Sequence, residues 1–175
     1  MQRNELQLSM PGDVQISVTS TKPIEMSREK LTLLSAYAPG VKITDNTDLS
    51  SFVITHIESD ENCAQQKYDE LIIKTPWDKN FEADLPHLLY SVARNLWLER
   101  GLYSAHAACV GNKLLPGHSG TGKSSTALAL ATTWGQRIYS GNTTLLDFSA
   151  EEPVRAIAGT KVMTLNSSDF DETTT

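Results

Sequence analysis

The segment from Gly117 to Ser124 limits what this chain can fold into more than any other part of the sequence. It consists of GHSGTGKS and therefore satisfies the pattern G-x-x-x-x-G-K-S. An apolar run, Lys113 to Pro116, precedes the segment, and an Ala- and Leu-rich stretch, residues 125–131, follows it. This order predicts a strand, a glycine-rich loop and a helix in immediate succession.

Each fixed residue of the segment has a physical reason to be there. Glycines allow successive backbone N–H groups to curl around phosphate oxygens, and the N-terminus of the following helix favours an anion. Lys123 adds a full positive charge, and the hydroxyl of Ser124 is suited to ligate Mg²⁺. The alternative is a glycine-rich turn that only caps a helix. We predict a nucleotide-binding loop made of Gly117, His118, Ser119, Gly120, Thr121, Gly122, Lys123, Ser124 and Ser125.

The charge and hydropathy of the chain argue against nucleic acid and membranes as partners. The chain has 15 Lys and Arg against 21 Asp and Glu, for a net charge of −6, and no dense basic run. Nucleic acid and anionic membranes are therefore not expected partners. No stretch approaches the apolar length of a membrane span, and the first residues lack an apolar signal segment, so we expect a soluble, cytoplasmic protein. Cys63 and Cys109 are expected to be reduced thiols. Homo-oligomerisation is left open.

The length of 175 residues predicts one domain or two small ones. Residues 1–82 show short alternating runs typical of strands and a short helix, and we expect a small N-terminal α+β region of unknown role. His56, Asp60, Glu61 and Cys63 could be considered as metal ligands, but a strand residue beside a solvated loop is the favoured interpretation. Leucines at helical spacing predict a core-packing helix from Glu82 to Arg100.

Residues 83–165 are expected to form an α/β phosphate-loop core, and residues 166–175 a disordered tail. Within the core, a strand from Tyr103 to Val110 and the tight turn Gly111-Asn112 predict a hairpin with the strand that leads into the glycine-rich loop. About fifty residues follow Ser124, so we expect the core to be incomplete. The first hundred residues or a partner could complete it, but a piece of a longer protein is the favoured explanation.

The region from His106 onward resembles the catalytic domain of HPr kinase/phosphorylase and related proteins. The likeness covers roughly residues 103–165. It rests on His106 at the start of a hairpin, the Gly111-Asn112 turn, the loop G-x-S-G-x-G-K-S, the Ala/Leu-rich helix and the segment Gly135-Gln136-Arg137. The resemblance implies a phosphate-loop core of HPr kinase C-terminal-domain type. It also implies an ATP- and Mg²⁺-dependent transfer of the γ-phosphoryl group to a hydroxyl of a protein, a peptide or a small molecule.

The chain departs from that family at one place. Gly141-Asn142 stands where the resemblance implies two Asp residues. The amide oxygen of Asn142 can coordinate a metal or orient a hydroxyl, but it cannot accept a proton at neutral pH. Asp147 is the carboxylate that could substitute, although it could equally open a surface turn. The candidate catalytic residues are therefore Lys123, His106, Asn142 and Asp147, with His106 also compatible with a plain strand histidine.

The sequence thus favours an ATP-dependent phosphotransferase. One alternative is a nucleotide-binding sensor or scaffold that lost catalysis with the acidic pair. A nucleotide-driven switch is disfavoured, because the sequence contains no Asn-Lys-x-Asp segment of the kind that recognises guanine.

Overall fold

The structure, a computed structural model, describes residues 3–25, 27–45, 50–149, 154–161 and 163. The expected tail, residues 166–175, lies outside this set. The chain divides into two compact units, of which the first comprises Met1–Leu34 and Val41–Arg100, and the second Ser35–Gly40 and Gly101–Thr175. The division of the chain therefore falls after Arg100 and not at residue 82, because the long helix that follows residue 82 packs within the first unit.

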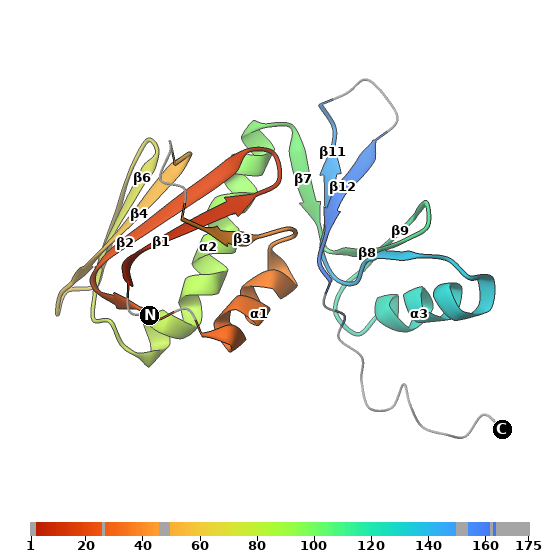
Figure 1. The fold of residues 1–175 in the computed structure, drawn as a ribbon, viewed down its shortest axis with the longest axis horizontal. Helices are drawn as coiled ribbons and strands as arrows, with labels where there is room; N and C mark the ends of the chain where they lie inside the picture. The colour runs from red at the N-terminus through yellow and green to blue at the C-terminus, as the bar shows by residue number, and fades with distance from the viewer. Residues whose placement is uncertain (1–2, 26, 46–49, 150–153, 162, 164–175) are drawn as a thin grey trace. The chain divides into compact units, whose positions relative to one another are not determined.

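The described residues form three helices and twelve strands (Figure 1). None of these helices has both the length and the apolar character that crossing a lipid bilayer requires. In chain order the elements are β1 (Arg3–Met10), β2 (Val14–Ile24), α1 (Arg28–Tyr37), β3 (Lys42–Thr44), β4 (Phe52–Glu58), β5 (Cys63–Lys67), β6 (Glu70–Thr75), α2 (Lys79–Glu99), β7 (Leu102–Ala105), β8 (Ala107–Val110), β9 (Lys113–Pro116), α3 (Lys123–Trp134), β10 (Ile138–Ser140), β11 (Thr144–Asp147) and β12 (Arg155–Gly159).

The first unit is built on a six-stranded mixed sheet. Its strand order is β3-β1-β2-β4-β6-β5, with β2, β4 and β6 parallel to one another and the remaining pairs antiparallel. Helix α2 packs against this sheet with its buried apolar face. Trp97 of α2 is fully buried, and its indole N–H donates a 2.8 Å hydrogen bond to the carbonyl of Pro11. The helix and the β1–β2 turn are thereby held together.

Helix α2 begins earlier than the leucine pattern predicts. The expected start was Glu82, but the helix starts at Lys79. The carboxylate of Asp78 caps it by accepting hydrogen bonds from the N–H groups of Asn80 and Phe81, both at 2.9 Å. An aspartate at this position satisfies N–H groups that have no partner within the helix. Pro86 consequently lies inside the helix.

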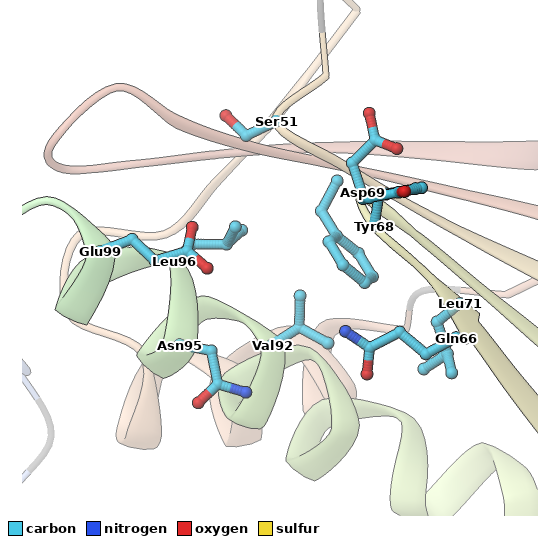
Figure 2. Close-up of a pocket in the computed structure, with 10 residues that line it drawn as sticks. Ser51, Gln66, Tyr68, Asp69, Leu71, Val92, Asn95, Leu96 and Glu99 are labelled. Carbon is cyan, nitrogen blue, oxygen red and sulfur yellow. The ribbon is translucent and has the colours of Figure 1, made fainter.

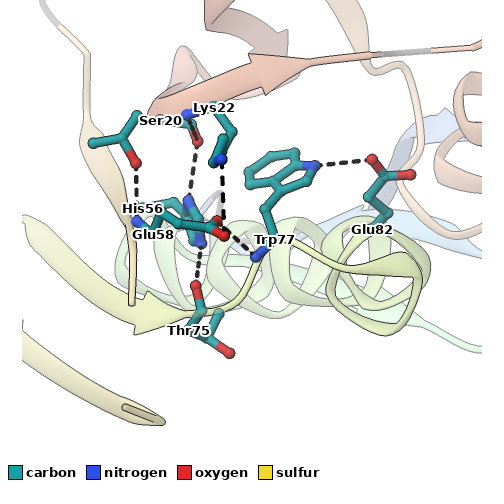
Figure 3. Close-up of polar contacts among 8 residues, drawn as sticks. Ser20, Lys22, His56, Glu58, Thr75, Trp77 and Glu82 are labelled. Atoms are coloured by element: carbon teal, nitrogen blue, oxygen red, sulfur yellow. Dashed lines mark hydrogen bonds and ion pairs between the residues drawn. The ribbon is translucent and has the colours of Figure 1, made fainter. Parts of the chain in front are cut away.

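A polar network surrounds His56 on the side of the sheet where β2, β4 and β6 end (Figure 3). The imidazole is 1% exposed, and its Nδ1 lies 3.0 Å from the hydroxyl of Ser20. Its Nε2 lies 2.9 Å from the carbonyl oxygen of Thr75. Because a carbonyl can only accept, Nε2 carries the proton in this arrangement. Trp77 and Phe81 pack on the ring, each with a centroid separation of 4.7 Å. His56 is therefore a hydrogen-bonded core residue.

The second unit contains two antiparallel three-stranded sheets, with orders β10-β8-β9 and β12-β11-β7. Helix α3 packs on the first of them, where Ala108, Val110 and Ala127 form a buried cluster. The single strand expected from Tyr103 to Val110 is wrong: β7 ends at Ala105 and β8 begins at Ala107. The two strands pair in different sheets, β7 with β11 and β8 with β9 and β10. The chain passes from one sheet to the other at His106.

Candidate functional site

The glycine-rich segment forms a curled loop between β9 and α3. Gly120 and Gly122 both have φ of 80°, in the left-handed region that non-glycine residues rarely adopt. Apart from the glycine, its two chain neighbours and the adjoining helix backbone, no heavy atom lies within 4 Å of the position that a Cβ would take at either glycine. At Gly117, by contrast, a Cβ would lie 2.5 Å from the hydroxyl oxygen of Thr121. Gly120 and Gly122 thus allow a backbone conformation that other residues rarely adopt, and Gly117 leaves room for the Thr121 side chain to come close.

The side chain of Lys123 folds back over this loop. Its ammonium group donates a 2.7 Å hydrogen bond to the carbonyl oxygen of His118. The hydroxyl of Thr121 donates to the same carbonyl at 2.8 Å. These two bonds close the loop on itself and hold one full positive charge beside its backbone. An anion that entered the loop would meet that charge at short range.

The loop delivers the chain directly into the N-terminus of α3. The cap residue Gly122 supplies no side-chain hydrogen bond to the first turn, in which Lys123, Ser124 and Ser125 lie. The first backbone N–H groups of a helix have no acceptor within the helix, and the helix dipole makes this end positive. Ser124 lies in this turn beside Lys123, so its hydroxyl belongs to the same end of the helix. A phosphate is the kind of group that fits such an end.

His106 lies at the loop end of strand β8. The register of the β8–β9 hairpin pairs Ala107 with Pro116. His106 directly precedes Ala107 and Gly117 directly follows Pro116, so both residues lie at this end of the hairpin. The partial removal of its ring from water lowers the pKa of His106, and the charges of Lys123 and His118 lower it further. The structure therefore brings His106 together with the loop, and its imidazole is favoured in the neutral form, which can accept a proton.

We expect the imidazole of His106 to titrate below the ordinary histidine value of about 6.5. The charge of Lys123 contributes to the lowering, so Lys123→Ala should move the pKa of His106 upward. An NMR pH titration of the ring protons measures this, with His106→Gln used to assign the resonance. The matched control is Lys113→Ala, at the other end of β9. A pKa of His106 that Lys123→Ala leaves unchanged would contradict the proximity of the two groups.

Asn142 lies close to the same end of the unit but is held by structural hydrogen bonds. Ser140 pairs with Cys109 and Thr144 pairs with Ala105, so the segment between them crosses from one sheet to the other alongside residues 105–109. The Asn142 amide nitrogen donates to the carbonyl oxygen of Ala36 at 3.1 Å. Its side chain is therefore already engaged in a contact that orients it.

Thr160 fixes this segment and was not identified from the sequence. Its hydroxyl oxygen is an acceptor for the backbone N–H groups of Asn142 and Thr143, at 3.1 and 2.9 Å, and the residue is 1% exposed. Its backbone exchanges hydrogen bonds with Gly141 and Thr143. A threonine after a strand carries no sequence signal for this role, because the partners lie 17 and 18 residues away.

Asp147 lies at the opposite end of β11 from this region. It pairs with Leu102 on one side and with Arg155 on the other. Leu102 is four residues from His106, which at about 3.3 Å per residue of extended chain separates these two residues by roughly 13 Å. The Asp147 carboxylate accepts hydrogen bonds from the hydroxyl and the backbone N–H of Ser149, at 2.6 and 2.8 Å. These bonds, aided by Arg155, lower the pKa of Asp147. The geometry matches the surface turn considered above.

Comparison with known proteins gives no family assignment. No protein-family model matches the chain, and no curated protein matches it significantly.

Proposed function

We propose that this protein binds ATP·Mg²⁺ through residues 117–125 and transfers the γ-phosphoryl group to a hydroxyl of a protein, a peptide or a small molecule. The observation that carries the proposal is the curled loop with the Lys123 ammonium 2.7 Å from the His118 carbonyl, at an uncapped helix N-terminus. The curled backbone of the loop, the Lys123 ammonium and the N-terminus of α3 each favour an anion. Their presence in one place is better explained by a polyphosphate ligand than by turn formation alone. The resemblance to HPr kinase/phosphorylase supports the same proposal.

In this proposal each residue has a defined role. The backbone N–H groups of the loop and Lys123 stabilise the charge on the β- and γ-phosphates. Ser124 would ligate Mg²⁺, which neutralises phosphate charge when it is bound. The acceptor oxygen forms a bond to the γ-phosphorus, the bond from that phosphorus to ADP breaks, and the acceptor's proton is released. The imidazole of His106, whose pKa is lowered, is a group near the loop that can accept that proton.

A second candidate function is nucleotide binding without turnover, as in a sensor or scaffold. It is favoured by a specific observation, namely that Asn142 occupies the place where the family resemblance implies a carboxylate and donates its amide to Ala36. Asp147 does not compensate, because it lies at the far end of β11 and is hydrogen-bonded to Ser149. We therefore leave Asp147 out of the proposed site.

The proposal is tested by titrating ATP into the purified protein in the presence of Mg²⁺ and measuring the heat of binding. We expect a saturable one-site isotherm, and a weaker one for AMP, which lacks the phosphates that Lys123 would contact. The absence of any binding of ATP at millimolar concentration would refute both candidate functions, since each requires an occupied loop.

A further inference from the structure

The first unit contains a cavity of about 590 Å³ that the proposed phosphotransferase site does not use. Figure 2 shows it between the C-terminal half of α2 and the β5–β6 hairpin. The apolar part of its lining comes from Phe52, Leu71, Val92 and Leu96. Binding sites for small organic molecules fall within about 300 to 1,000 Å³ and are mostly apolar with a few polar groups.

The sequence builds both walls of this cavity in a regular way. On α2, Val92 and Leu96 are one helical turn apart, and Asn95 and Glu99 share the same face. On the hairpin, Gln66 lies directly opposite Leu71, so both side chains point to the cavity side. The next pair along the hairpin, formed by Lys67 and Glu70, points to the other face.

The charged groups on the rim of the cavity are carboxylates. Asp69 and Glu99 line it, and within the described part of the chain neither forms an ion pair. Arg100, which follows Glu99, and Lys67, which follows Gln66, are basic residues next to the lining. The Arg100 guanidinium donates to the carbonyl of Leu96 and to the hydroxyl of Ser51, at 2.9 and 3.2 Å, and so lies at the Ser51 end. Among the described residues, none of those that line the cavity is basic.

We propose that this cavity binds a small organic cation, an ammonium or guanidinium group carried on an apolar body. The apolar body covers the side chains of Phe52, Leu71, Val92 and Leu96, and its transfer from water is favourable. The cationic group then meets Asp69 and Glu99, whose charges no basic residue of the cavity lining offsets. An anion with the same body would be repelled by those carboxylates, so the site discriminates by charge.

The test uses phenethylammonium as the probe, added to the isotopically labelled full chain and followed by amide NMR. We expect saturable shifts confined to cavity residues such as Leu71, Asn95 and Leu96, with a dissociation constant in the millimolar range for so small a ligand. Two matched probes separate the contributions: 3-phenylpropionate has a similar body and the opposite charge, and ethylammonium has the charge without the ring. Neither should produce saturable shifts at these residues.

Variants test whether the two carboxylates cause the preference for a cation over an anion. Asp69→Asn combined with Glu99→Gln should weaken phenethylammonium binding about fivefold or more and should narrow its preference over 3-phenylpropionate. Glu70→Gln, on the other face of the hairpin, is the control and should leave binding unchanged. No saturable shift with phenethylammonium, equal binding of 3-phenylpropionate, or shifts centred elsewhere would each overturn the proposal. Because the test does not involve nucleotide, its failure is distinct from failure of the proposed function.

Discussion

Lys123→Ala should abolish the thermal stabilisation that ATP·Mg²⁺ gives to the wild-type protein. At a nucleotide concentration 100 times the dissociation constant, a ligand that binds only the folded state stabilises it by about 2.7 kcal/mol. For a chain of this length that corresponds to a rise in melting temperature of roughly 5 to 10 °C. The variant loses the ammonium group that Lys123 holds over the loop, and with it the positive charge that would face the outer phosphates.

A control is needed because any lost lysine changes the net charge of an acidic protein. Lys113→Ala makes the same charge change in the same unit, but Lys113 lies at the far end of β9, where its ammonium donates to the side chain of Asn112 at 3.2 Å. It should keep the full ATP-dependent rise. Differential scanning fluorimetry with and without ATP·Mg²⁺ measures all three proteins. An equal ATP-dependent rise in melting temperature for wild type and Lys123→Ala would show that Lys123 does not contribute to nucleotide binding.

Local sequence patterns predicted the elements around the candidate site. The strand–loop–helix succession from Lys113 to residue 131 matches β9 and α3, and the Gly111-Asn112 turn joins β8 to β9. These features are local, because turn residues, strand residues and helix-forming residues each act on their immediate neighbours. The same holds for the leucine spacing that predicted most of α2.

Elements that depend on distant partners were not predictable in this way. Strand β5, with the sequence CAQQK, is exposed at every residue and exists through its backbone pairing with β6. The break at His106 is also non-local, since nothing between Tyr103 and Val110 interrupts a strand pattern, and only the pairing partners of β7 and β8 reveal it. Strand β1 is different, because Leu6, Leu8 and Met10 alternate and are buried, so its signal was present in the sequence.

The residues of the candidate site also include some whose position depends on local sequence and some whose position depends on distant partners. Proximity of His106 to the loop follows from the hairpin register, which the short turn specifies. The contact of Asn142 with Ala36, by contrast, joins residues 106 positions apart and cannot be inferred from either neighbourhood. That contact bears directly on whether the proposed transfer reaction proceeds.

Asn142→Asp should raise Mg²⁺-dependent phosphate release from ATP by about 100-fold or more if loss of the carboxylate is what limits the reaction. In this assay water takes the place of the hydroxyl substrate and receives the γ-phosphoryl group, and the new carboxylate accepts the proton that water releases. The substitution has a structural cost. The Asn142 amide donates to the Ala36 carbonyl, whereas a carboxylate has no hydrogen to donate and would repel that oxygen. We therefore expect the free energy of unfolding to fall by about 1 to 3 kcal/mol.

Two variants separate these effects. Asn142→Ala removes the hydrogen bond to Ala36 without adding a charge, so it should lower stability and give no gain in phosphate release. Asp147→Asn alters a carboxylate at the other end of β11 and should leave phosphate release at the wild-type level. A wild type that already releases phosphate as fast as Asn142→Asp would contradict the sensor alternative, because the amide would then suffice for catalysis. If both proteins bind ATP and neither releases phosphate, a carboxylate at residue 142 does not produce transfer to water, which is the result that the sensor alternative predicts.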